Sequence, residues 1–483
     1  MDGTLGKKTV AGILWSSLQK FGTMAISFVS NIFLARMLTP DDYGCIGMLM
    51  IFIAVANVFI DGGFGSALIQ KKRPTPQDYS TIFYWNLILS VILYAVLYAS
   101  APSVAGFYGM PELSKVLRVQ GVVLIFNAFS VIQNNQLRKR LEFKKTASIN
   151  LVSMSLASVM AIVMAYRGFG LWSLVGQQLT YSLLNAVQLW IRSAWRPMPV
   201  FSRSSFRELS GFGAFILLSN LINTFCNNVQ GLLIGKFFSP SVMGLYSQAR
   251  KLEEVASTSI SGVVDQVSYP VLAEVQDDRT RLAGATGRLV TSIAFFTLPL
   301  MFLLIAVAEP LITILYSDRW VECVPYFQVL CVAGMAVSLQ NINYFAVAAT
   351  GRSRALLVWT IVKRSLSIVF IVAGFAALGI KGLLAGMVLA AFTVYAVNAA
   401  LVSKYVGYRI GRQIADLLPV AAVSAAAFAA AYVPVMCDMA DILQLVASVA
   451  LFAAVYLGIS ALLGLKAYRN VRELLPLLLK GKR

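Results

Sequence analysis

Two apolar stretches of the sequence carry polar side chains at helical spacing. They are Lys20, Thr23, Ser27 and Ser30 in the first stretch and, 200 positions later, Asn220, Asn223, Asn227 and Gln230 in the second. Intervals of three, four and three residues place each set on one face of a helix. Because a polar stripe against lipid is costly, we expect both stripes to contact a polar cargo. The alternative is that they hydrogen-bond to neighbouring helices and only stabilise packing.

Lys20 is the cation of these stripes. It follows Val10, where the apolar run begins, by ten residues, so at helical rise it lies ~15 Å deep in that run. A cation at this depth needs an anion close to it. Two anions are possible: the pyrophosphate of a cargo, or a carboxylate on another helix.

The densest group of charges inside an apolar run lies near residue 250. It comprises Arg250, Glu254, Ser257, Ser261 and Asp265, spaced by four, three, four and four residues, with Lys251 and Glu253 beside them. Arg250 and Glu254 form an i,i+4 pair that could simply neutralise itself. Alternatively, Arg250 and Lys251 bind a phosphate, for which the planar guanidinium is suited, and Glu254 or Asp265 carries a proton or a sodium ion.

Asp61 is a third candidate for ion coupling. At helical rise it lies ~27 Å beyond Tyr43, near the far end of its apolar run. Gly62 and Gly63 follow it directly, and Gly65 comes soon after. Glycines at this density predict a loosened helix end, which could be a hinge or a broken helix that Asp61 caps.

The elements that position these residues must be membrane spans. Hydrophobic residues make up 58% of the 483 residues, charged residues 13%, and the mean hydropathy is +0.75. These values exclude an ordinary soluble protein and predict an all-α protein with fourteen spans. We place the spans near residues 10–35, 44–68, 80–101, 114–136, 147–166, 170–191, 209–235, 243–270, 287–307, 324–349, 355–377, 382–403, 414–436 and 442–464.

The cations orient these spans. Of the 40 Lys and Arg residues, 30 lie in loops or in the adjoining parts of spans on the N-terminal side of the predicted membrane, and seven lie in or beside the opposite loops. The positive-inside rule therefore predicts that both termini are cytoplasmic. The net charge of +19 is explained by these loops, so we expect no nucleic-acid partner.

Neither metal nor cofactor chemistry is expected. The sequence contains no His, and its five Cys form no CxxC pair, which argues against a structural metal site or a disulfide framework. The Gly-Lys pairs lack the remaining residues of a phosphate-binding loop, so the chain is not predicted to hydrolyse ATP. A gradient of protons or sodium ions is the energy source that we consider.

A duplicated motif divides the chain. LARMLTPDDYG (Leu34 to Gly44) recurs as IGKFFSPSVMG (Ile234 to Gly244), with Pro and Gly at matching positions. The shift predicts two parallel six-helix bundles that face a central cleft, followed by an appended helix pair. The predicted boundaries are 1–191 for the first bundle, 192–208 for a cytoplasmic linker, 209–405 for the second bundle and 406–483 for the appended helices and a basic tail.

Four motifs of the first half together resemble those of one transporter family. They are LARMLTPDDYG (34–44), DGGFGSALIQ (61–70), LRKRLEFKKTA (137–147) and GFGLWSLVGQQL (168–179). They are similar to the Wzx-type polysaccharide flippases of the MOP exporter superfamily, in the colanic-acid and teichuronic-acid branch. The resemblance covers roughly residues 10 to 405, more weakly in the second half.

This resemblance implies a function. Such proteins move an undecaprenyl-pyrophosphate-linked oligosaccharide across the bacterial inner membrane by alternating access, for capsule, exopolysaccharide or O-antigen assembly. In that family, spans 1, 2, 7 and 8 line the cleft, and the polysaccharide polymerase or export machinery is a possible partner, besides membrane lipids. The sequence departs from the family at Asp265 and Gln266, where a basic residue is expected before the Tyr-Pro pair.

Two other functions have different sequence requirements. A multidrug cation exporter of the same superfamily should have a cleft dominated by acidic residues, whereas Lys20, Arg250 and Lys251 favour an anionic cargo. A membrane glycan polymerase or ligase should carry a large external loop with catalytic residues, and this sequence predicts no such loop. We therefore expect a transporter and not an enzyme.

Overall fold

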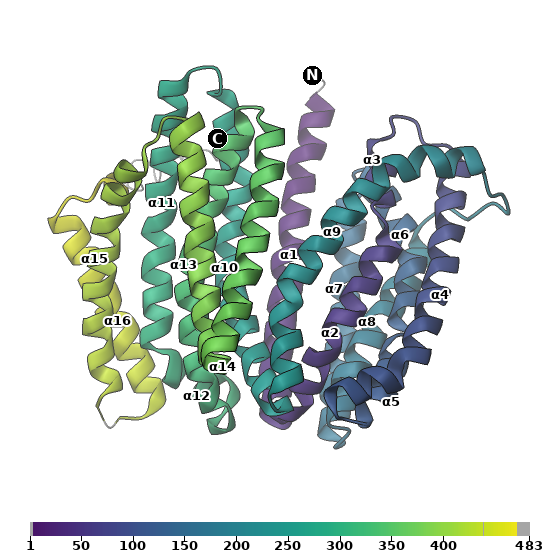
Figure 1. Ribbon diagram of the computed structural model, residues 1–483, viewed down its shortest axis with the longest axis horizontal. Coiled ribbons are helices and arrows are strands. Elements are labelled where there is room, and N and C mark those ends of the chain that lie inside the picture. The colour runs from purple at the N-terminus through teal and green to yellow at the C-terminus, as the bar shows by residue number, and fades with distance from the viewer. Residues whose placement is uncertain (1–2, 438, 471–483) are drawn as a thin grey trace. The chain divides into compact units, whose positions relative to one another are not determined.

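The computed structural model describes residues 3–437 and 439–470, and within these ranges every regular element is helical. The chain forms two compact units, Met1–Gly244 and Leu245–Arg483. Figure 1 shows the order of the helices along the chain. Among the described residues, nine helical stretches are long and apolar enough to cross a membrane, or ten if the bent helix at Arg203–Phe237 is counted as one span.

The first unit contains nine helices. They are α1 (Gly3–Met37), α2 (Pro40–Asp61), α3 (Phe64–Gln70), α4 (Pro76–Tyr108), α5 (Glu112–Gln120), α6 (Val123–Lys139), α7 (Phe143–Tyr166), α8 (Leu171–Arg192) and α9 (Arg203–Phe237). Helices α2 and α4 each begin with a Thr-Pro pair, and the Thr forms a capping box with an Asp three residues later. These local signals start the two helices four residues before the predicted spans at 44–68 and 80–101.

Glycines bring the helices of this unit close together. A side chain at Gly12 would meet Phe143, and one at Gly22 would meet Leu151, so α1 packs closely on α7. In α9, Gly235 lies against Met48 in the same way. Helix α9, the counterpart of α1 in the repeat, therefore packs within the first unit.

The two copies of the duplicated motif contact each other. A Cβ atom at Gly44 would collide with the carbonyl oxygen of Pro240, and one at Gly244 would collide with that of Pro40. The contact is reciprocal, as expected where two related elements meet across a local pseudo-two-fold axis. The Pro and Gly of the motif are thus explained by packing as well as by the helix start.

The second unit continues with seven further helices and a 3-10 turn. They are α10 (Pro240–Glu274), α11 (Arg279–Ala306), α12 (Ala308–Tyr316), η1 (Asp318–Cys323), α13 (Val324–Ala349), α14 (Ser353–Tyr405), α15 (Ile410–Val435) and α16 (Asp441–Leu462). A buried apolar cluster joins α11, α13 and the end of α14, and it includes Val290, Ile342 and Val402. This cluster holds the cores of the predicted spans 9, 10 and 12 together.

Helix α14 consists of two arms. Leu378 and Gly379 have non-helical backbone angles, with φ of 60° at Gly379, a value that favours glycine. The arms lie against each other through Gly374 and Gly382, whose Cβ atoms would each collide with the other's carbonyl oxygen. The sequence prediction of two helices at 355–377 and 382–403 is confirmed. The expected domain boundaries at 191, 208 and 405 stay a prediction.

Candidate functional site

The stripe of α1 lies opposite the apolar surface of that helix. Lys20 is exposed, and Thr23 and Ser27 are half-buried. Leu18 and Val29, which are exposed large apolar residues, project from the other side of the helix at 3.6 residues per turn. The polar face of α1 therefore points away from the surface suited to lipid.

One end of the same stripe serves packing. The Ser30 hydroxyl is buried and accepts a hydrogen bond from Gln177 Nε2 at 3.1 Å. The neighbouring Asn31 is also buried, and its Oδ1 accepts a hydrogen bond from the Tyr43 hydroxyl at 3.3 Å. The alternative interpretation, hydrogen bonding between helices, thus holds for Ser30, while Lys20 lies on accessible surface.

The stripe of α9 has the same character. Asn220 and Asn223 are half-buried and Asn227 is exposed. Leu218, with 59% of its surface exposed, and Phe225 project from the opposite side of the helix. Both copies of the repeat therefore carry a polar face that is separate from the apolar face.

Gln230 closes the α9 stripe where this helix meets α2. It is 9% exposed, and its Oε1 atom has no hydrogen-bond partner among the described residues. The next residue, Gly231, lies close enough to α2 that a side chain there would come within 3.9 Å of the Gly47 carbonyl oxygen. A buried acceptor without a donor costs about 1–3 kcal/mol, so this amide is suited to receive a donor from water or a cargo hydroxyl.

The charged turns of α10 form a cluster within the second unit. The Arg250 guanidinium donates a hydrogen bond to the Tyr246 hydroxyl, and Glu253 and Glu254 both lie near enough to act on its charge. Lys251 is half-buried, and Glu254 acts on it as well. Arg250 therefore has more partners than the single i,i+4 partner considered from the sequence.

Glu253 and Ser257 form the inner side of this cluster. The Ser257 hydroxyl donates a hydrogen bond to the Glu253 carboxylate, and both groups lie against Gly334 of α13, where a Cβ atom would collide with Glu253 Oε1. Glu254 is exposed instead. Tyr246 and Glu253 have no predicted role, although their i,i+4 spacing to Arg250 and Ser257 is a sequence signal that identifies them.

Asp61 lies at a helix break, as its neighbours indicate. Helix α2 ends at Asp61, and Gly62 and Gly63 adopt left-handed backbone angles with φ of 55° and 68°. The carboxylate is exposed, and a Cβ atom on Gly65 would lie 3.2 Å from its Oδ1. The side chain of Asp265, the other ion-coupling candidate besides Glu254, is outside the part of the chain that the structure describes.

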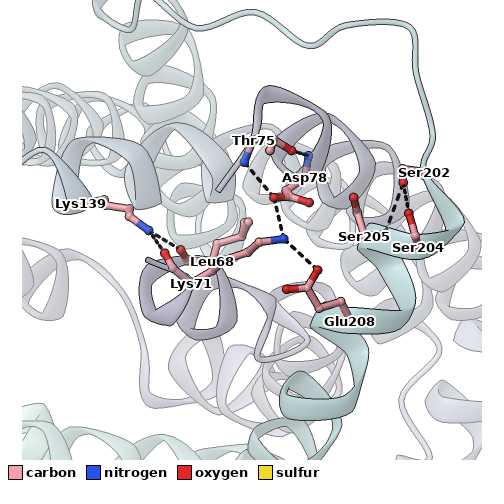
Figure 2. A network of polar contacts seen from close by, with 9 residues as sticks. All are labelled: Leu68, Lys71, Thr75, Asp78, Lys139, Ser202, Ser204, Ser205 and Glu208. Atoms are coloured by element: carbon pink, nitrogen blue, oxygen red, sulfur yellow. Dashed lines mark hydrogen bonds and ion pairs between the residues drawn. The ribbon is translucent and has the colours of Figure 1, made fainter. Parts of the chain in front are cut away.

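Figure 2 shows a polar network at the loop that follows α3. The Lys71 ammonium lies 3.0 Å from an oxygen of Asp78 in α4 and 2.9 Å from one of Glu208 in α9. The hydrogen bond to Glu208 raises the pKa of Lys71, so this bridge is present below the ordinary lysine pKa and is lost as the pH rises through the raised one. Lys71, interpreted from the sequence as an orientation signal, also ties α9 to the loop.

A second cation completes this network. The Lys139 ammonium donates hydrogen bonds to the carbonyl oxygens of Leu68 at 2.8 Å and Ile69 at 3.3 Å, and to that of Lys71. These carbonyls belong to the last turn of α3 and the residue after it, where a cation is favourable. The break after Asp61 is thus followed by a helix whose far end is firmly held. Among the described residues, no group of three or more His, Cys, Asp or Glu side chains could hold a metal ion.

Comparison with known sequences identifies the family. The family described as "Polysaccharide biosynthesis protein" matches residues 33–325, which is more than half of the chain and includes both copies of the duplicated motif. The chain belongs to this family. Polysaccharide biosynthesis proteins with a similar sequence include the teichuronic acid biosynthesis protein TuaB of Bacillus subtilis (strain 168), 26% identical over 74% of this chain and 74% of its own length.

Two further comparisons extend this assignment. The lipopolysaccharide biosynthesis protein WzxC of Escherichia coli (strain K12) is 23% identical over 70% of this chain and 69% of its own length. The solved structure of the lipid II flippase MurJ in an inward closed conformation covers 95% of this chain and 99% of its own, with a TM-score of 0.75 and 14% identity. This family member therefore has a fold like that of MurJ, and the sequence resemblance to Wzx-type polysaccharide proteins is confirmed. It is a multi-span helical membrane protein.

Proposed function

We propose that this protein flips an undecaprenyl-pyrophosphate-linked oligosaccharide from the inner to the outer leaflet of the bacterial inner membrane by alternating access. The observation that carries the proposal is the polar face of α1, where the exposed Lys20 lies opposite the apolar surface of the helix. A cation on a face separate from lipid is suited to a phosphate that must cross the membrane.

The remaining predicted site residues suit different chemical groups of the cargo. The amides of Asn220, Asn223, Asn227 and Gln230 each offer donors and an acceptor, which suits sugar hydroxyls. The guanidinium of Arg250 and the ammonium of Lys251 suit the pyrophosphate. Asp61, Glu254 and Asp265 remain the candidates for coupling to protons or sodium ions. Thr23 and Ser27 extend the polar face of α1 beside Lys20.

We infer fourteen spans with both termini in the cytoplasm. Nine helical stretches satisfy the length and composition criteria, the two arms of α14 make one of these into two, and α1, α8, α9 and α10 supply four more. The partition of loop cations supports this orientation. Reporter fusions at Arg140, Arg203 and Arg354 should then report the cytoplasm, and those at Pro111 and Asp318 the outside; one inversion would exclude the topology.

A multidrug exporter is the main alternative, and the polar face of α1 argues against it. The only charge of that face, the ammonium of Lys20, would repel a cationic drug. The two cations of α10, Arg250 and Lys251, offset the nearby carboxylates of Glu253 and Glu254. The glycan polymerase or ligase, the other alternative, is disfavoured by the short connections between helices. An association with a polysaccharide polymerase or export machinery stays a prediction.

Deletion and complementation test the proposal. A strain without the gene should accumulate its lipid-linked oligosaccharide on the cytoplasmic face of the membrane, and the wild-type gene should restore surface polysaccharide. The Lys20→Ala variant should insert normally but restore little. Full restoration by Lys20→Ala at equal protein level would remove Lys20 from the cargo path, while absence of accumulation in the deletion strain would contradict the flippase function itself.

A further inference from the structure

A basic cavity of about 510 Å³ lies in the second unit, away from the charged turns of α10. Its walls come from the first half of α11, the start of α15 and the segment that follows α16. Its volume is within the range of small-molecule pockets, roughly 300–1,000 Å³. Nothing in the proposed flipping mechanism uses it.

Four cations surround this cavity with a single carboxylate. The cations are Arg288, Arg412, Lys466 and Arg469, and the carboxylate is Asp416. Asp416 is already engaged, because it accepts a hydrogen bond from the Tyr408 hydroxyl at 2.8 Å and lies 3.4 Å from the Lys466 ammonium. Among the described residues, the three arginines have no ion-pair partner. The cavity therefore has a surplus of positive charge that an anion would compensate.

The cavity is held open by a defined framework. The Asn470 amide donates a hydrogen bond to the Thr291 hydroxyl at 3.3 Å, and the Tyr468 ring packs on Phe295, so the segment after α16 is fixed on α11. Gly287 leaves room for the Tyr408 ring, and a Cβ atom on Gly284 would meet no other atom within 4 Å. The empty space beside Gly284 is thus part of the fold and is available to a ligand.

Its position favours a lipid over a soluble ion. The cavity lies where helices begin and end, which in a membrane protein is the level of the headgroups. Leu462 and Leu463, 87% and 65% exposed, come just before Lys466 and offer apolar surface to acyl chains. Gly464 then turns the chain with φ of 55°, so the apolar and the basic residues follow each other around one helix end.

We propose that this cavity binds the phosphate headgroup of an anionic membrane phospholipid. The headgroup phosphate lies among the guanidinium groups of Arg288, Arg412 and Arg469. Each guanidinium can donate two parallel hydrogen bonds to two oxygens of one phosphate. The acyl chains lie along the apolar surface at Leu462 and Leu463. The bound lipid fastens the segment after α16 to α11.

Native mass spectrometry of the full-length protein tests this site. Phosphatidylglycerol and phosphatidylcholine are titrated against the wild type, the double variant Arg412→Ala/Arg469→Ala, and Gly284→Leu. Removing two arginines should weaken phosphatidylglycerol binding about 30-fold. Gly284→Leu changes no charge and places a good helix former in α11, but its side chain fills the cavity. It should therefore also abolish the binding of phosphatidylglycerol. Arg203→Ala/Arg207→Ala, which removes two exposed charges from α9, is the matched control and should bind as the wild type does.

Each other result has a definite meaning. Equal phosphatidylglycerol affinity of the wild type and both cavity variants would overturn the proposal. Equal loss in the α9 control would do so as well, because it would mean that net charge alone attracts the lipid. Displacement of phosphatidylglycerol by an equal concentration of inorganic phosphate would assign the cavity to a soluble phosphate.

Discussion

Helices α2 and α10 occupy the same place in the two copies of the repeat, yet they differ in nearly everything beyond their first turn. Both begin at a proline and share the glycine through which the copies touch. Helix α2 then breaks at Gly62 and Gly63, whereas α10 is one helix of 35 residues with a charged cluster in its third and fourth turns. Duplication preserved the part that packs against its own copy, and function diverged in the remainder.

Substitutions at the glycine contact between the two helices should have the largest effect on stability. Gly44→Ala and Gly244→Ala each force a Cβ atom against a proline carbonyl of the other copy. We expect each to lower the free energy of unfolding by about 3 kcal/mol, the upper part of the range for overpacking. Thermal unfolding of the purified protein measures this. Gly106→Ala, a helical glycine with no atom within 4 Å of its added Cβ, is the control and should not be destabilised.

Substitutions of the charged residues of α10 that have no counterpart in α2 should have a large effect on transport. Arg250→Ala should lower surface polysaccharide about 10- to 100-fold at equal protein level, because in the proposed site it removes a charge-assisted hydrogen bond to the cargo. Arg250→Lys should recover part of the activity, since it keeps the charge but not the planar fork. Met50→Ala, at the matching position of α2, should export normally.

The double variant Arg250→Met/Glu254→Leu sharpens this test. If Arg250 only paired with Glu254, an apolar pair could replace both with transport largely intact. We expect loss of export, because Arg250 also contacts Tyr246 and acts with Glu253. Normal export from the double variant would remove Arg250 from the cargo site.

The stripes of α1 and α9 should be accessible to water to a similar degree in both copies of the repeat. Single cysteines at positions 20, 23, 27, 220, 223 and 227 should react quickly with small water-soluble thiol reagents in intact membranes. Cysteines at Leu18 and Leu218, which are exposed on the apolar side of the same helices, should react slowly. Equal reactivity of both sides would mean that the stripes do not meet water.

The smallest effect on stability is expected from substitutions in the polar network around Lys71, which follows α3. Glu208→Gln removes one exposed partner of Lys71 and should destabilise the protein by less than about 1 kcal/mol. Asp78→Asn should cost more, because this carboxylate is buried and also caps α4. The difference between wild type and Glu208→Gln should shrink in high salt. A salt-independent difference would indicate that the glutamate acts through packing.

The local features of this fold follow from the sequence because they depend on neighbouring residues. Apolar runs locate the helices, Thr39 and Thr75 with their prolines start two of them, and Gly62 and Gly63 mark a break. The stripes and the charged turns of α10 were identified in the same way. Their residues are three or four positions apart, so helix geometry alone brings them to one face.

The contacts that complete the site could not be predicted, because they join residues far apart in the chain. Glu253 and Ser257 meet Gly334, and Lys71 meets Glu208. The same holds for the contact between Gly44 and Pro240: the repeat signals that both positions matter, but periodicity cannot tell a helix start from a packing contact. A single sequence does not indicate which residues far apart in the chain come into contact.

The two arms of α14 have a consequence for biosynthesis. Their contacts join Gly374 to Gly382 and Phe370 to Gly386, so the partners are separated by 8 and 16 residues. Contacts between such near neighbours form early, since little chain entropy is lost in closing them. The hairpin can therefore close as soon as its second arm has been synthesised, before α15 and α16 exist. It provides a finished surface on which the last part of the chain assembles.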